Sequence, residues 1–383
     1  MIEIVKGFKD YIGEEALTRE KIKEILIREF KIYGFEPAET PIIEYENFVK
    51  GNNQQDEVIS DIFKLQDKGK RNLALRYEFT FQLKRLAKNK KLPYRRYQIG
   101  EVFRDEPVTA NRFRQFTQCD IDIVGSTIKD EAEILALSKE ILDELKIKNI
   151  ININNKKLIN EILEEQKIKN KEQIIKEIDK LDKLPENEVK KNLKKYKAEK
   201  ILNIFKQPEK YFERYQYYKE IKELKDYCKL YNIKVNFQPS LARGLSYYNG
   251  SVFEVKSSIK ETIVAGGSYL INNIQSTGIS FGLERLSSLT KIKTENIKCI
   301  VISINQDKEA IKIAESLRKK NISCFIIDKV SKALDYADKQ KIPYIIFIGS
   351  KEVIKNKFKL RDMKTGKEIL FTEAELIKLF NKK

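Results

Sequence analysis

The chain has 383 residues, and its 75 lysines and arginines against 57 acidic residues give a formal net charge of +18. It contains no histidine, which excludes Ser-His-Asp triads, Cys–His pairs and histidine metal sites. The charge alone leaves two interpretations open: a lysine-coated surface without a special partner, or a surface that binds the phosphates of a nucleic acid.

The four cysteines are far apart and show no paired spacing, which predicts reduced thiols rather than a disulfide framework or a zinc site. No apolar run reaches the roughly 18 residues of a membrane span. The N-terminus lacks the apolar core of a signal peptide. We therefore expect a soluble, cytoplasmic protein without a membrane partner.

The N-terminal third of the chain predicts a helix and a long hairpin. Apolar residues recur at helical spacing over residues 14–34. Two alternating stretches, Tyr97–Arg104 and Arg112–Val124, predict strands joined by a turn over Asp105–Asn111. Five of the 15 arginines of this lysine-rich chain lie in or just before the hairpin. Because arginine grips phosphates and carboxylates bidentately, the hairpin predicts a surface for a polyanion.

The remainder of the chain shows three patterns. Residues 157–231 are rich in Lys, Glu, Ile, Leu and Asn at helical spacing and contain no glycine, which predicts a helical insertion. Glycines return over residues 244–282, between segments that alternate as β-strands. Short apolar strands and amphipathic stretches over residues 297–383 predict a βαβαβ unit with a terminal hairpin and helix.

One face of the second hairpin strand combines groups for an anionic and a cationic ligand. The two-residue period places on this face Arg112, Arg114, Phe116, Gln118, Asp120 and Asp122, and on the core side Cys119, Ile121 and Ile123. The arginines suit phosphates, the ring suits a base, and the amide and carboxylates suit a cation. A wet hairpin face with cross-strand Arg–Asp pairs is the structural alternative.

Two further segments carry candidate ligand-binding groups. The segment Leu73–Thr80 predicts a strand end with Glu78 and Thr80 side by side. In Leu241–Glu254, an arginine next to Gly244 allows the backbone and a guanidinium to approach a ligand closely, and two adjacent tyrosines can line a polar pocket.

Together, and in this order, these segments resemble a class II aminoacyl-tRNA synthetase, specifically the histidyl-tRNA synthetase family. The three class motifs are matched by Phe30–Tyr45, Tyr97–Asp122 and Gly278–Leu286. The histidine-specific signatures are matched by Leu75–Thr80, Gln118–Asp122 and Arg243–Tyr248, and a phrase of the anticodon-binding domain by Lys359–Gly366.

The resemblance implies a fold and its domains. The expected fold class is an α+β catalytic domain with a central antiparallel sheet flanked by helices, a mostly helical insertion, and a C-terminal α/β anticodon-binding domain. The catalytic domain would comprise residues 1–150 and 236–292, the insertion residues 151–235, and the anticodon-binding domain residues 297–383. Since the family's first motif lies at a dimer interface, a homodimer is expected.

The resemblance also implies substrates and site residues. ATP, with Mg²⁺, would be held by Arg104, Glu106, Arg112, Phe116 and Arg285, and L-histidine by Glu78, Thr80, Gln118, Asp122, Arg243, Tyr247 and Tyr248. Arg104 and Arg243 would act in catalysis at the α-phosphate, and Tyr248 and Asp122 would grip the imidazole. The acceptor of the activated amino acid would be tRNA(His).

The sequence departs from the family's pattern at three positions. Ser246 stands where many members have aspartate, Asp122 where many have glutamate, and Asn111 where a loop glycine is frequent. We expect these changes to affect the affinity for the ligands more than the assignment to the family.

Two alternatives belong to other functional classes. One is a non-catalytic, histidyl-synthetase-like regulatory subunit of ATP phosphoribosyltransferase that binds histidine, and the other is a plain RNA-binding protein. The α/β segment 297–383 and the joint presence of Arg104, Arg112, Arg243 and Arg285 favour the enzyme over the regulatory subunit. The Arg243–Tyr248 signature argues against the RNA-binding protein.

Overall fold

The computed structural model describes residues 3–50, 61–109, 112–182, 184–242, 247–259, 261–294 and 297–381. The chain forms two compact units, Met1–Ile292 and Lys293–Lys383. Among the helices in these described ranges, none is both long and apolar enough to cross a membrane.

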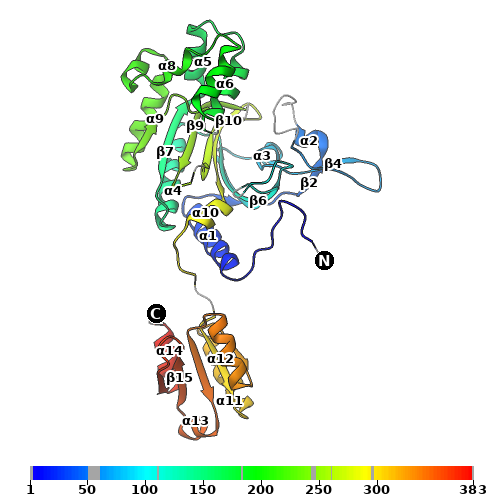
Figure 1. Ribbon diagram of the computed structural model, residues 1–383, viewed down its shortest axis with the longest axis vertical. Helices are drawn as coiled ribbons and strands as arrows, with labels where there is room; N and C mark the ends of the chain where they lie inside the picture. Colours follow the sequence, from blue (N-terminus) through cyan, green and yellow to red (C-terminus); the bar gives the residue numbers. More distant parts are fainter. Residues whose placement is uncertain are drawn as a thin grey trace. The chain divides into compact units, whose positions relative to one another are not determined.

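The first unit is built on an eight-stranded sheet with the strand order β1-β5-β6-β11-β10-β9-β7-β8 (Figure 1). Its strands are β1 (Glu36–Pro37), β5 (Tyr94–Phe103), β6 (Gln115–Val124), β7 (Ile150–Asn155), β8 (Val235–Phe237), β9 (Tyr248–Lys256), β10 (Val264–Ile271) and β11 (Ile274–Gly282). Neighbouring strands are antiparallel except for the two outer pairs, β1–β5 and β7–β8. The prediction of a central antiparallel sheet is therefore confirmed.

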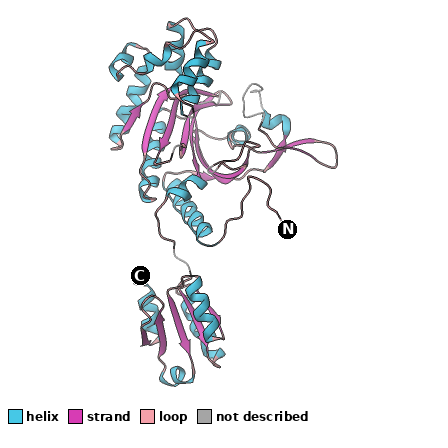
Figure 2. Ribbon diagram, viewed as in Figure 1, coloured by secondary structure: helices cyan, strands magenta, loops and turns pink. Residues whose placement is uncertain are grey.

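Helices cover both faces of this sheet. Helices α1 (Gly13–Ile32), α4 (Ile128–Glu144) and α10 (Leu283–Leu289) lie on one face, where their apolar side chains pack with Cys119, Ile121 and Ile123 of β6. Helix α3 (Thr80–Leu86) lies on the other face, inside the curve of the sheet (Figure 2). The alternation predicted for β6 thus holds, and its polar residues face the side of α3.

A small sheet and a group of helices complete the first unit. The small sheet has the order β2-β4-β3, and consists of β2 (Ile43–Tyr45), β3 (Lys64–Gln66) and β4 (Asn72–Leu75), with α2 (Glu46–Lys50) beside it. The helical prediction for residues 157–231 is confirmed by α5 (Lys156–Glu165), α6 (Lys171–Asp179), α7 (Glu186–Lys194), α8 (Ile201–Phe205) and α9 (Tyr218–Leu230), with the 3₁₀ turns Lys180–Asp182 and Glu209–Arg214. Apolar residues of these helices continue the main core.

The second unit is a five-stranded sheet with the order β13-β12-β14-β15-β16. Its elements are β12 (Cys299–Ser303), α11 (Asp307–Arg318), β13 (Cys324–Ile327), α12 (Val330–Lys339), β14 (Tyr344–Ile348), α13 (Ser350–Lys355), β15 (Phe358–Asp362), β16 (Glu368–Phe371) and α14 (Glu373–Asn381). Helices α11 and α14 pack on one face and α12 on the other. The predicted βαβαβ unit with a hairpin and a last helix is confirmed, and the short α13 was not predicted.

Two local predictions were wrong. The second hairpin strand begins at Gln115, so Arg112 and Arg114 belong to the connecting loop, where the Arg114 N–H donates to the Gly7 carbonyl, outside the β5–β6 ladder. The strand predicted to reach Thr80 ends at Leu75. Thr80 is instead the first residue of α3.

Candidate active site

The floor of the site is formed by β6 and β11. Their register pairs Gln118 with Gly282, Asp120 with Ser280, and Asp122 with Gly278, so the three polar side chains of β6 stand opposite small residues. A Cβ atom at Gly278 would overlap Asp122 Oδ1 and would lie 2.7 Å from the Tyr269 hydroxyl oxygen. Glycine is therefore required there if the two polar groups are to meet.

A buried carboxylate, Glu78, forms one wall of the site. It lies in the irregular segment between β4 and α3, its side chain is almost fully buried, and its Oε1 atom has no hydrogen-bond partner. The Tyr247 hydroxyl donates to the other oxygen at 3.5 Å. Burial raises the pKa of Glu78 to about 8, Arg104 opposes this rise, and Asp120 and Asp122 add to it.

Asp120 and Asp122 extend the acidic group along β6. Burial, followed by the neighbouring Asp122, raises the pKa of Asp120 to about 7. The Asp120 Oδ1 atom is buried without a hydrogen-bond partner. Burial also raises the pKa of Asp122, against the opposing effect of Arg96. This group of three neighbouring buried carboxylates favours a ligand that brings positive charge or N–H donors.

Three tyrosines line this acidic pocket. The ring centroids of Tyr247 and Tyr248 are 4.8 Å apart, and that of Tyr269 lies 5.5 Å from Tyr247 and 6.3 Å from Tyr248. The hydroxyl that donates to Asp122 is that of Tyr269. The sequence analysis paired Asp122 with Tyr248 and did not select Tyr269. The glycine pair two positions before Tyr269 was the available signal that this strand lies close to a neighbour.

An arginine-rich group lies at the other end of the hairpin. Two nitrogens of Arg104 donate to the Tyr77 carbonyl at 3.2 Å each, and its guanidinium carbon lies 5.1 Å from the centroid of the Phe116 ring. Glu106 forms an ion pair with Arg112, and its carboxylate lies 4.0 Å from Arg104. The loop therefore neutralises part of its own charge, which the sequence did not reveal.

The remaining predicted residues lie at the margin of this group or outside the described residues. The Gln118 amide donates to the Ser280 hydroxyl at 2.9 Å, and its Oε1 atom is buried without a hydrogen-bond partner. Arg285, in the first turn of α10, donates to the Thr262 carbonyl at 2.5 Å. It lines a cavity of about 680 Å³ that also borders Tyr11 and Phe113. Arg243, Ser246 and Asn111 lie outside the described residues.

Most of the predicted site residues are thus brought to one face of one hairpin and its neighbours. This group of side chains is acidic and aromatic around Glu78, Asp120 and Asp122, and basic around Arg104 and Arg112. Such a polarity suits a cationic amino acid at one end and a polyphosphate at the other. Sequence reasoning missed Arg96 and Tyr269, which reach the pocket from strands paired only in the fold.

Comparisons with known proteins agree on one family. The histidyl-tRNA synthetase family model matches residues 7–286, and an anticodon binding domain model matches residues 298–383. Histidine--tRNA ligase 1 of Bacillus cereus is 35% identical, over 95% of this chain and 96% of its own length. Histidine--tRNA ligase of Borreliella afzelii is 31% identical, over 98% of this chain and 96% of its own length.

Two solved structures share the fold. Histidyl-tRNA synthetase from Nostoc sp. PCC 7120 has a TM-score of 0.86 at 24% identity, with 100% of this chain and 99% of that chain covered. A protein described as an ATP phosphoribosyltransferase regulatory subunit/histidyl-tRNA synthetase, from Bacillus halodurans C, has a TM-score of 0.77 at 20% identity, with 91% and 98% covered. With the family model matching most of the first unit and relatives above 30% identity over nearly the whole length, the chain belongs to the histidyl-tRNA synthetase family.

Proposed function

We propose that this protein is a histidine–tRNA ligase, which activates L-histidine with ATP, releases pyrophosphate and transfers histidine to the 3′ end of tRNA(His). The observation that carries this proposal is the polarity of the pocket: buried carboxylates at one end and Arg104 with Arg112 at the other. An amino acid and ATP placed along this pocket would meet where the two ends join.

At the acidic end, Glu78, Thr80 and Gln118 receive the α-ammonium group of histidine, and Asp122 with Tyr248 receives the imidazole. Tyr247 supports this end, because its hydroxyl already donates to Glu78. The unpartnered Glu78 Oε1 and Gln118 Oε1 atoms supply acceptors for the ammonium group. Arg243 bridges the histidine carboxylate and the α-phosphate.

At the basic end, Arg104 holds the α-phosphate, Glu106 and Arg112 hold the adenine and the terminal phosphates, and Phe116 stacks on the adenine. Arg285 lies against the nucleotide from the side of α10. The Arg104 guanidinium is already beside the Phe116 ring, at 5.1 Å from its centroid, so the groups for the α-phosphate and the adenine are neighbours.

This chemistry requires no histidine side chain. The nucleophile is the amino acid's carboxylate, which is already anionic and needs no general base. What the reaction needs is in-line positioning and neutralisation of the charge that grows on the α-phosphate. Arg104 and Arg243 supply this positive charge, so a chain without histidine remains competent.

Mg²⁺ would enter with ATP. The described residues contain no group of three or more side chains that could hold a metal ion by themselves. Mg²⁺ is commonly bound by one or two carboxylates together with substrate phosphates. The ion would neutralise phosphate charge, and no residue of this chain is assigned to it.

Pyrophosphate–ATP exchange with each of the twenty amino acids, at millimolar Mg²⁺, tests the proposed activity. Exchange with histidine alone is the expected result. A folded protein that binds histidine but exchanges with none of them would instead be the regulatory subunit. That alternative is not better supported, because an anticodon binding domain model matches residues 298–383 and the relatives above 30% identity are named as histidine--tRNA ligases.

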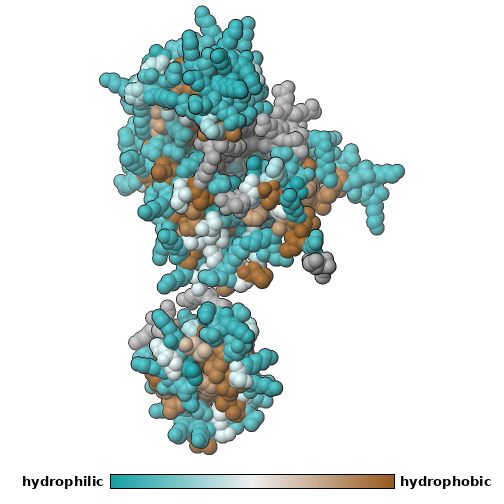
Figure 3. Space-filling view, viewed as in Figure 1, coloured by the Kyte–Doolittle hydropathy of each residue, from teal (hydrophilic) through white to brown (hydrophobic). Residues whose placement is uncertain are grey.

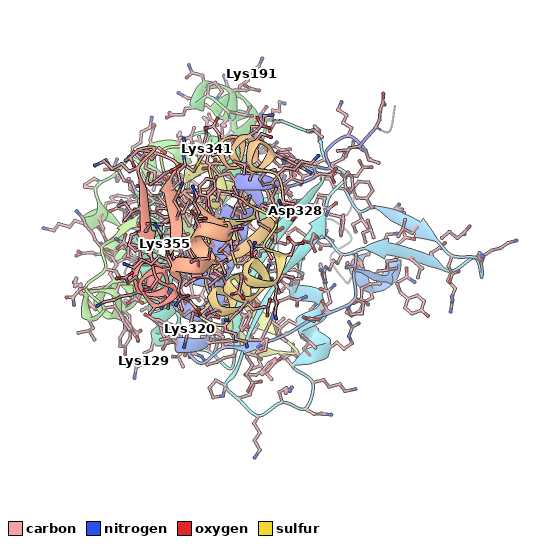
Figure 4. The ribbon with its side chains drawn as sticks, turned by 90° about the horizontal axis from the view of Figure 1, so that it is seen from below. Lys129, Lys191, Lys320, Asp328, Lys341 and Lys355 are labelled. Carbon is pink, nitrogen blue, oxygen red and sulfur yellow. The ribbon has the colours of Figure 1, made fainter. Side chains whose placement is uncertain are left out.

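Binding of tRNA(His) is expected to weaken strongly with salt. Exposed lysines lie on both units, among them Lys129, Lys191, Lys320, Lys341 and Lys355 (Figure 4). Because phosphate contacts release counterions, we expect affinity for tRNA(His) to fall about 100-fold or more between 50 and 200 mM salt. Fluorescence anisotropy with labelled tRNA(His) measures this fall, and a change below about threefold would contradict a lysine-based interface.

We also propose a homodimer that uses the small sheet of the first unit. Ile43 and Tyr45 of β2 are 50% and 59% exposed, and hydrophobic side chains gather around this sheet and the N-terminal segment (Figure 3). Ile43→Asp is expected to raise the dimer dissociation constant at least about tenfold, because a charge would enter an apolar interface. Sedimentation equilibrium measures it. Ile354→Asp, at a more exposed isoleucine of the second unit, is the control, and an unchanged Ile43→Asp dimer would place the interface elsewhere.

A cytoplasmic location follows from this proposed role in translation. The four cysteines are all free, as the thiols of a protein in a reducing compartment would be.

A further inference from the structure

Among the described residues of the first unit, the largest fully buried side chain belongs to an arginine that contacts Asp122. Arg96, on β5, is completely buried, and the β5–β6 register places it opposite Asp122. Its Nη2 atom lies 2.7 Å from Asp122 Oδ2. The cost of burying a guanidinium is high, so a buried arginine needs a specific partner.

The surroundings of Arg96 fix its position on several sides. Its Nη1 atom donates to the Gln98 side-chain carbonyl at 3.2 Å, and its Nη2 atom donates to the Phe79 carbonyl at 3.3 Å. Its guanidinium carbon lies 6.0 Å from the centroid of the Phe79 ring. Arg96 is thus anchored by its own strand and by the segment that carries Glu78.

Asp122 retains the capacity to bind a ligand in spite of these contacts. Its Oδ1 atom accepts the Tyr269 hydroxyl. Its Oδ2 atom forms the ion pair with Arg96 but has no aligned hydrogen bond. A carboxylate has about four acceptor sites, so Oδ2 can still accept a hydrogen bond from an N–H group.

Asp122 also differs from the other two carboxylates of the pocket. Glu78 and Asp120 are buried beside it, Arg104 acts on the charge of both, and Arg96 acts on that of Asp120. Among the described residues, neither forms an ion pair with an arginine like that between Asp122 and Arg96. Burial disfavours the anion at all three positions. The direct arginine contact therefore stabilises the anion of Asp122 in a way that the other two carboxylates lack among the described residues.

We propose that Arg96 is a positioning residue for substrate selection, which holds Asp122 as an oriented anion so that its Oδ2 atom accepts the ring N–H of histidine. This inference rests on the proposed function and names the residue behind its ring recognition. Arg96 acts through Asp122 and does not touch the substrate. Tyr269 completes the arrangement by fixing the other carboxylate oxygen.

The test compares histidine with thiazolylalanine, an analogue of similar shape whose ring has no N–H group. Pyrophosphate–ATP exchange gives kcat/KM for each, and their ratio reports on ring recognition. For Arg96→Leu we expect the histidine KM to rise about 100-fold and the ratio to fall at least about tenfold. The KM for ATP should stay within about threefold. Arg96→Lys, which keeps the positive charge, should recover part of the ratio.

Arg96→Leu leaves Asp122 buried without its partner and can prevent folding. The double variant Arg96→Leu/Asp122→Asn removes both charges and keeps the comparison possible. We expect it to unfold close to the wild-type temperature and still to show the reduced ratio. A double variant that discriminates as the wild type does would overturn the inference, because neither charge would then be needed.

The wild-type measurement separates this inference from the proposed function. If the wild type exchanges with histidine and Arg96→Leu keeps its discrimination, the role of Arg96 is wrong and the activity stands. If the wild type neither exchanges with histidine nor binds it in calorimetry, both are wrong.

Discussion

Replacing Arg104 with alanine is expected to lower kcat for histidine-dependent pyrophosphate exchange about 1,000-fold. The guanidinium would lie at the α-phosphate, where charge grows in the transition state, and one such preorganised donor typically contributes about 100- to 1,000-fold. Arg104 also opposes the raised pKa of Glu78, together with the hydrogen bond from Tyr247. We therefore expect a smaller second effect, a histidine dissociation constant raised by less than about tenfold, measured by calorimetry.

Arg95→Ala is the matched control for this variant. Arg95 lies on β5, the strand that Arg104 directly follows, and is similarly exposed, but it forms ion pairs with Glu133 and Asp130 of α4. Its loss should leave the exchange rate within about threefold. Arg104→Lys should fall between wild type and alanine, because lysine keeps the charge but not the planar fork. An Arg104→Ala protein that retains more than a tenth of the wild-type rate would mean that another group holds the α-phosphate.

Features of the site that depend on local periodicity could be predicted from the sequence. The two-residue period of β6 correctly placed Gln118, Asp120 and Asp122 on one face and Ile121 in the core. The helical spacing of residues 157–231 likewise predicted the helices α5–α9. In both segments a regular backbone decides which side chains share a face, so the local sequence is sufficient to predict it.

Features that depend on pairing between distant segments could not be predicted. Arg96 meets Asp122 because of the β5–β6 register, and Tyr269 meets Asp122 because β10 and β11 place a glycine between them. A shift of one residue in either register would turn these side chains to the opposite face. Only the folded sheet therefore identifies Arg96 and Tyr269 as parts of the pocket.

The hairpin loop shows a different limit of sequence reasoning. The alternation of residues 112–124 predicted one continuous strand. The strand begins only at Gln115, because the residues before it make contacts within the loop. Arg112 forms an ion pair with Glu106, and Arg114 pairs with Asp105 at 3.0 Å. An alternating pattern is compatible with a strand, but it gives no information on ion pairs that hold the first residues in a loop instead.

Replacing Glu78 with glutamine is expected to make the free protein more stable at pH 8 and to impair the use of histidine. Burial raises the pKa of Glu78 to about 8, well above the value of about 4.3 in an unfolded chain. The folded protein therefore holds a proton on Glu78 that the unfolded chain has released, and stability from this group is lost as the pH rises from about 4.3 to about 8. Glutamine does not titrate, so its variant avoids this loss.

The measurable consequence is a pH-dependent difference in melting temperature between Glu78→Gln and wild type. The corresponding difference in unfolding free energy should grow by about 1.4 kcal/mol per pH unit between pH 5 and pH 8 and level off above pH 8, after a total change of about 5 kcal/mol. Comparing the two proteins at each pH removes the titration of groups that do not interact with Glu78, and the remaining difference includes the coupling of Glu78 to Asp120. Differential scanning calorimetry gives the curves, and a difference that does not change between pH 5 and pH 8 would contradict the raised pKa of Glu78.

The same substitution should lower kcat/KM for histidine about 100- to 1,000-fold, because a neutral amide replaces the carboxylate that receives the α-ammonium group. Glu131→Gln is the matched control, since Glu131 is equally buried on α4 and burial raises its pKa to about 7. It packs on the other face of the sheet, so it should repeat the gain in stability without the loss of activity. If both variants lose activity alike, the effect belongs to the sheet as a whole. If only Glu78→Gln does, the unfavourable burial of this carboxylate is retained because histidine binding requires it.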